Sequence, residues 1–359
     1  MRPPRWVVGC GGHLGTPGRD HDSGSVHFFR AGDAVSAAAC LALYGFAVAV
    51  LAPRLLRGVG DASAVPRVAL AAWLATLATT VLAWTTALTI LVFDVLTHQL
   101  SEAPRRILDG CITHMHDAAI GRYGAPVQTG LLLLAGSASL AAVVVTMRLG
   151  ATLLRARRTT LEHAALTRMA GRHHPDLDAV VLEVDQPAAY CVAGKPHTVV
   201  ISRGVLTALD EDHLEAVLAH ERAHLAGRHH LLLALTRGLS TTLPRINLFS
   251  IGALEVAWLL EMMADDAAAR IHGRRTVLQA LRALSGIASG PAGALGATEV
   301  GLTTRLQRLE APAARALRAR TRLTLAAVTA MATLVPMAAV LTAAIGIVIC
   351  APIPGGSHI

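Results

Sequence analysis

The chain has 359 residues, of which 53% are hydrophobic and only 16% charged, and its mean hydropathy is +0.51. This balance is unusual for a soluble domain of that length and indicates a membrane protein in contact with a lipid bilayer. The net charge of +8 comes almost wholly from arginine, because Lys195 is the only lysine. These arginines cluster beside apolar runs, as charges that flank membrane helices do. We therefore expect no direct nucleic-acid binding. The five cysteines include no C-x-x-C pair, which argues against a disulfide framework and against a cysteine zinc site.

Four apolar runs are long enough, at roughly 20 residues, to cross a bilayer core about 30 Å thick. They cover residues 34–53, 68–95, 128–150 and 323–350. Each run is apolar on all faces and is bounded by arginines, which favours membrane helices over buried helices of a soluble core. We therefore predict a disordered extension over residues 1–31, a membrane domain over 32–154, and a last span with a short extracytoplasmic tail over 321–359.

The placement of arginine predicts the orientation of these spans. Two dense clusters lie after the third run and before the fourth: Arg148, Arg155, Arg157 and Arg158, then Arg315, Arg318, Arg320 and Arg322. By the positive-inside rule, residues 155–320 between these clusters lie in the cytosol, and the loop over residues 97–126 lies outside. The sequence thus predicts a multi-pass protein of the cell membrane with one large cytosolic domain.

The predicted cytosolic domain begins with β-branched runs between Ala179 and Ser202, which indicate a small antiparallel sheet. Helices follow, and Asp210 is a favourable N-cap for the first long one. Two apolar runs at residues 231–235 and 248–260, with Pro244 between them, are too short to be assigned as spans. We expect them to form a buried helical hairpin, with a position against the membrane as the alternative.

The helix that begins at Asp210 carries the motif His220-Glu221-x-x-His224. Residues four apart on a helix differ by about 40° around its axis, so both histidines project from one face and can bind one Zn²⁺. Glu221 can then take a proton from a zinc-bound water and pass it to the leaving amine. The motif predicts peptide hydrolysis, with Glu221 as the catalytic base.

Two residues compete for the place of third zinc ligand. Gly227 and His230 complete the longer pattern H-E-x-x-H-x-x-G-x-x-H, which requires the helix to stop at Gly227. A single glycine costs a helix only about 1 kcal/mol, and good helix formers continue to Arg237, so we expect the helix to continue. His230 would then point about 240° away from the ligand face, which favours Glu261.

Glu261 and Asp265 share one face of a second predicted helix, in the sequence EMMADDAAAR. Together with the first motif, this stretch resembles the gluzincin membrane proteases: the HtpX and CAAX-prenyl-protease group and, more closely, the antibiotic-sensing transducers of the BlaR/MecR type. The resemblance implies Glu261 as the zinc ligand beside His220 and His224, and Asp265 as the partner that orients a ligand histidine. The transducers carry a large penicillin-binding domain after the last span, whereas only about nine residues follow here, so direct β-lactam sensing is not expected.

Several other polar residues receive structural interpretations. Arg305 and Arg308 are expected to be solvated helix charges, and Asp266 is expected to face solvent. Three histidines outside the motif are expected on the surface: His173, His174 and His229. Cys191 is expected to be a half-buried strand residue and not a nucleophile.

The predicted fold is a mostly α-helical membrane protein, with four transmembrane helices and a cytosolic α+β gluzincin domain between the third and fourth. The leading functional hypothesis is a Zn²⁺-dependent endopeptidase at the cytosolic membrane face, acting on a protein or peptide. The resemblance suggests a transcriptional repressor as substrate. The alternatives are a quality-control protease of the HtpX kind and a non-catalytic membrane scaffold or receptor; an intact Glu221 argues against the latter.

Overall fold

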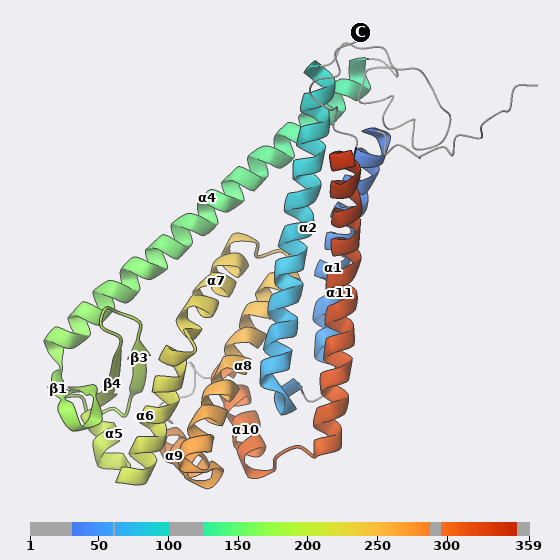
Figure 1. Cartoon of the computed structure of the whole chain (residues 1–359). Coiled ribbons are helices and arrows are strands. Elements are labelled where there is room, and N and C mark those ends of the chain that lie inside the picture. The colour runs from blue at the N-terminus through green and yellow to red at the C-terminus, as the bar shows by residue number, and fades with distance from the viewer. Residues whose placement is uncertain (1–30, 60–61, 101–124, 288–295, 350–359) are drawn as a thin grey trace, which may run out of the picture.

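The computed structural model describes residues 31–59, 62–100, 125–287 and 296–349 of the chain. It is mostly helical, with one small sheet (Figure 1). The predicted extension over residues 1–31 falls almost entirely outside the described residues, as do most of the predicted outer loop over 97–126 and the tail after 350.

Four long helices dominate the molecule: α1 (Ala31–Gly58), α2 (Pro66–Leu100), α4 (Ala125–Ala170) and α11 (Arg315–Ile349). Helices α1, α2 and α11 lie side by side, while α4 diverges from them towards the sheet (Figure 1). The predicted boundary at residue 154 therefore falls inside one continuous helix, α4, which carries the third apolar run directly into the following domain.

Within the part of the chain that the structure describes, four helical stretches are long and apolar enough to cross a membrane: Ala37–Gly58, Pro66–Phe93, Leu132–Ala170 and Asn247–His272. The first three coincide with the predicted runs. The fourth is α8 (Asn247–His272), for which a buried hairpin was expected, and half of its apolar window is buried. The predicted last span, residues 323–350, lies largely in α11, where most side chains after Leu334 are outside the described part of the chain. This composition indicates a membrane protein.

Helix α8 connects the membrane-type helices to the rest of the molecule. Gly252 of α8 lies so close to α2 that an added Cβ would contact Leu77 at 3.3 Å, and the rings of Trp84 and Phe249 are 6.3 Å apart. Near the end of α1, Arg57 pairs with Glu255 of α8 at 2.9 Å. The apolar face of the N-terminal half of α8 is thus explained by packing on α1 and α2.

The sheet contains β1 (Arg172–His174), β2 (Ala179–Leu182), β3 (Ala189–Val192) and β4 (Thr198–Ser202), in the order β1-β2-β4-β3. Strands β2 and β4 are parallel and the other pairs antiparallel, so the expectation of a wholly antiparallel sheet was wrong. The segment between β2 and β3 passes over Gly204, whose N–H donates to the carbonyl of Val184 at 3.1 Å. This wide path carries β3 beyond β4 and leaves β3 at an edge.

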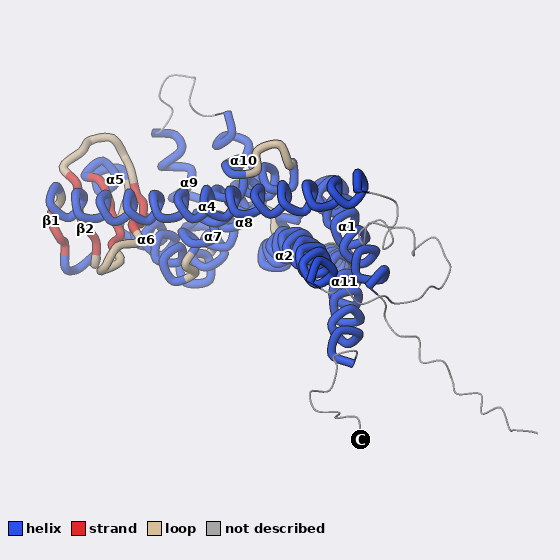
Figure 2. The backbone as a smooth tube through the Cα atoms, turned by 90° about the horizontal axis from the view of Figure 1, so that it is seen from above, coloured by secondary structure: helices blue, strands red, loops and turns tan. Residues whose placement is uncertain are grey.

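Five shorter α-helices join α8 in the rest of the described chain: α5 (Arg203–Ala208), α6 (Glu211–Ala226), α7 (His229–Thr242), α9 (Arg274–Ile287) and α10 (Gly296–Glu310). Two 3-10 helices are η1 (Ala62–Ala64), between α1 and α2, and η2 (Pro175–Leu177), between β1 and β2. The predicted N-cap is confirmed, because the Asp210 carboxylate accepts from the N–H of His213 at 2.9 Å. Helix α6 lies between the sheet and the α8–α9 pair, as the view from above shows (Figure 2). Helix α6 is therefore enclosed by the sheet on one side and by α8 and α9 on the other.

Candidate metal centre

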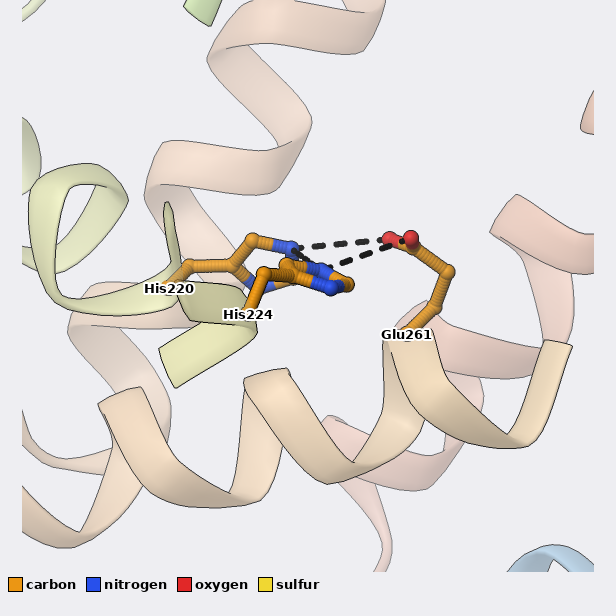
Figure 3. Close-up of side chains that lie close together, drawn as sticks. All are labelled: His220, His224 and Glu261. Atoms are coloured by element: carbon orange, nitrogen blue, oxygen red, sulfur yellow. Dashed lines mark hydrogen bonds and ion pairs between the residues drawn. The ribbon is translucent and has the colours of Figure 1, made fainter. Parts of the chain in front are cut away.

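His220 and His224 on α6 face Glu261 on α8, and their ligand atoms all lie within 4.8 Å of one another (Figure 3). The two Nε2 atoms are 3.2 Å apart, and they lie 3.5 and 3.4 Å from the carboxylate oxygens of Glu261. Four ligands in a tetrahedron around Zn²⁺, with bonds of about 2.1 Å, stand roughly 3.4 Å apart. The three residues therefore have the spacing and donor types of a zinc site, with the fourth position left for water.

A buried ion-pair network lies behind one of these histidines. The Nδ1 atom of His220 is 3.1 Å from Oδ1 of Asp265, which is 1% exposed. Arg305 of α10 donates to both oxygens of that carboxylate, from Nε and Nη2, each at 2.7 Å. Arg305 Nη1 also lies 3.1 Å from Glu261. Asp265 is thus placed to orient His220, and Arg305 joins Asp265 to the candidate third ligand.

The interpretation of Arg305 and Arg308 as solvated charges was wrong. Their side chains are only 15% and 14% exposed, and Arg308 pairs with Asp266 and donates to the carbonyl of Ser63 at 2.7 Å. The expectation that Asp266 faces solvent was therefore also incomplete. The sequence offered little sign that these arginines are buried, because two arginines three residues apart are common on exposed helices. Their acidic partners lie about 40 residues earlier in the chain.

Replacing Arg305 by Gln is expected to weaken zinc binding by about 10- to 100-fold, because Asp265 and Glu261 lose the cation that fixes them. Arg305→Lys keeps the charge but cannot bind the carboxylate with two parallel hydrogen bonds, so its affinity should be intermediate. The measurement is zinc affinity by chelator competition, with the exposed Arg275→Gln as control. Wild-type affinity in Arg305→Gln would show that this network does not support the site.

The two histidines differ in pKa. Burial lowers the pKa of His220, but hydrogen bonds to Asp265 and Glu261 outweigh burial and raise that pKa to about 9. Burial lowers the pKa of His224 to about 4, so its imidazole is neutral and has a free lone pair. A metal ion must displace the proton of His220, so metal affinity should fall as the pH falls.

Glu221 lies beside this group. It lines a cavity of about 300 Å³ together with His220, Glu261, Asp265 and Arg305. Burial raises the pKa of Glu221, although the charge of His220 opposes the shift. A carboxylate with a raised pKa holds an abstracted proton better than an exposed one does, which suits a general base.

Cys191 of β3 is half-buried, as expected, and its thiol is close enough to Glu221 to feel the charge of that carboxylate. Burial, followed by the charge of Glu221, raises the pKa of this thiol to about 12. A thiol that stays protonated is a poor nucleophile, which agrees with the expectation that Cys191 is not one. Ala189 of the same strand lines the cavity together with Glu221, so β3 forms part of the wall of the candidate site.

Helix α6 ends at Ala226, so the prediction that it continues past Gly227 was wrong. Arg228 adopts a left-handed conformation with φ 50°, and α7 begins at His229. Gly227 itself has an ordinary helical φ of −76°, so its glycine is not needed for the backbone. Instead, a Cβ there would lie 2.6 Å from Cδ2 of His229, which shows that side-chain packing selects this residue.

His230 does not join the candidate ligands even though the helix stops. Its ring lies near His197, with centroids 6.1 Å apart, and its buried Nδ1 has no hydrogen-bond partner in the described part of the chain. His173 and His174 are exposed, as expected, but His229 is only 4% exposed, so its assignment to the surface was wrong.

Comparison with known proteins bears on the stretch that contains the first motif. Residues 154–258 match the model of Peptidase family M48. The matched stretch includes His220, Glu221 and His224, and it supports a metallopeptidase of the membrane type. It ends before Glu261, so the candidate third ligand rests on the geometry described above. No solved structure matches the chain.

Proposed function

We propose that the chain is an integral-membrane, Zn²⁺-dependent endopeptidase that uses His220, His224 and Glu261 as ligands and Glu221 as general base. The observation that carries this proposal is the near-tetrahedral spacing of the three ligand atoms beside Glu221. The family match over the first motif supports it independently, because proteins of that family are metallopeptidases and usually contain zinc.

The chemistry follows from the side chains around the cavity. Bound zinc supplies Lewis acidity, which polarises a peptide carbonyl and eases deprotonation of water. The Glu221 carboxylate takes the proton of the attacking water and transfers it to the leaving nitrogen, which needs a proton to depart. Asp265, paired with Arg305, holds His220 through Nδ1 so that Nε2 faces the metal position.

Strand β3 favours a polypeptide as substrate. It pairs only with β4 among the described strands, so its other edge can accept a further strand, and Ala189 of β3 lines the same cavity as Glu221. An extended peptide can bind such an edge as an additional strand, with affinity from the main chain. We therefore propose that the substrate is an unfolded or extended protein segment.

The biological role of the proposed cleavage is suggested only by the resemblance to signalling transducers, which points to a transcriptional repressor. A quality-control protease would have the same active site, and an intact Glu221 disfavours a scaffold. The test is a comparison of membrane and cytosolic proteomes from cells with wild-type protein and with Glu221→Gln. Accumulation of one regulator in the variant supports signalling, whereas accumulation of many damaged membrane proteins supports quality control.

We also propose that the catalytic domain faces the cytosol. Cys191 is a poor reporter of sidedness because its thiol is half-buried and stays protonated. A single cysteine at the exposed Asp176, in a background without other cysteines, should resist a membrane-impermeant thiol reagent on intact cells and react after lysis. A single cysteine at Cys111, which lies outside the described residues, should react on intact cells. The opposite labelling would reverse the orientation.

A further inference from the structure

The two proposed ligand histidines of α6 are held by different partners at their Nδ1 atoms. The partner of His220 is the Asp265 carboxylate, at 3.1 Å. The partner of His224 is a third imidazole, because Nδ1 of His229 lies 2.9 Å from Nδ1 of His224. Their ring centroids are 4.8 Å apart and their planes are perpendicular. His229 thus stands in the same relation to His224 as Asp265 does to His220.

Local structure fixes His229 in this place. The left-handed residue Arg228 separates α6 from α7, and His229, the first residue of α7, lies against His224 in the last turn of α6. Gly227 leaves the space that the His229 ring occupies, since an added Cβ would collide with Cδ2 and Nε2 of that ring. With 4% exposure, His229 has little access to water, so its Nδ1 depends on His224 for a hydrogen bond.

We propose that His229 is a positioning residue for His224 and sets its tautomer. This inference rests on the proposed zinc site. Two imidazole nitrogens at 2.9 Å share one proton, which can be on either ring. If His229 donated it, the neutral His224 would carry its own proton on Nε2, which could not then bind a metal ion. The proton must therefore be on Nδ1 of His224, and the lone pair of His229 Nδ1 accepts it.

The partner of His224 is neutral, in contrast to the carboxylate behind His220. An imidazole acceptor orients the ring and fixes its tautomer without adding negative charge, so the site keeps the charge balance set by Glu261, Asp265 and Arg305. His229 therefore contributes the alignment of Nε2 of His224 with the proposed metal position. The effect of its loss should therefore appear in zinc affinity itself, and it should depend on where the replacement side chain presents an acceptor.

The test uses detergent-purified full-length protein and measures zinc affinity by competition with a chelator. His229→Asn places an amide oxygen near the position of Nδ1, whereas His229→Gln presents its oxygen further out, near Nε2, and His229→Phe fills the space without any acceptor. We expect His229→Gln and His229→Phe to weaken zinc binding by about 10- to 100-fold and His229→Asn by only a few fold. The neighbouring His230→Phe, which does not contact His224, is the matched control and should bind zinc as wild type does.

The asparagine–glutamine pair decides the question even if the phenylalanine variant does not fold. Equal affinity in wild type and His229→Gln would overturn the inference, as would equal losses in His229→Asn and His229→Gln, because only the volume of the ring would then matter. If wild-type protein binds no zinc at His220 and His224, the proposed function fails as well. If wild type binds one zinc ion and the His229 variants bind it equally, only the positioning role fails.

Discussion

Glu221→Gln is expected to abolish peptide hydrolysis while leaving the bound zinc in place. Glu221 is not among the three converging ligand residues, so its neutral isostere should not change metal content. The rate should fall by about 10²-fold or more, because the attacking water loses its proton acceptor. The measurements are zinc per protein by elemental analysis and cleavage of an unfolded protein substrate by the purified enzyme.

A matched control for this variant lies on the same helix. Glu215 pairs with Arg222 on the outer side of α6, and Glu215→Gln makes the same chemical change away from the cavity. It should retain wild-type activity. Full activity in Glu221→Gln, with Glu215→Gln also active, would contradict the assignment of the general base and would require another acceptor for the water proton.

Glu261→Ala is expected to lose both zinc and activity, whereas His230→Ala should keep both. Glu261 is the only described carboxylate that joins His220 and His224 within 4.8 Å, and its removal leaves a two-histidine site that holds zinc weakly. His230 faces His197 and contributes no ligand atom to this group. Zinc content and peptidase activity of the two variants, prepared in parallel, test the assignment.

Glu255→Ala provides the control for carboxylate removal from α8. Glu255 is nearly two turns before Glu261 and pairs with Arg57, so its loss affects packing against α1 but not the ligand group. It should retain zinc. Loss of zinc in His230→Ala together with retention in Glu261→Ala would identify the longer histidine pattern as the ligand set, and it would remove the resemblance on which the signalling hypothesis depends.

Short-range patterns determined much of this protein. The spacing of His220 and His224 put both rings on one helix face, because helical geometry is fixed over one turn. Asp210 capped its helix as expected, since a cap depends on residues within three positions. Three of the four apolar runs proved to be long apolar helices, because composition over 20 residues is itself a local property.

Contacts between distant segments decided the rest. Arg305 was read as a surface charge because nothing in its own helix shows that Asp265 lies beneath it, 40 residues earlier. The stop of α6 could not be read from the helix propensity of Gly227, because Gly227 keeps a helical φ and the break is at the left-handed residue Arg228. The position of β3 beyond β4 also involves distant residues, because the segment between β2 and β3 packs against Gly204. The sequence predicted which side chains face the candidate metal position. The packing of α8 on α6, and of α10 on α8, determined which partners meet them, because burial and ion pairing act between elements that no local pattern connects.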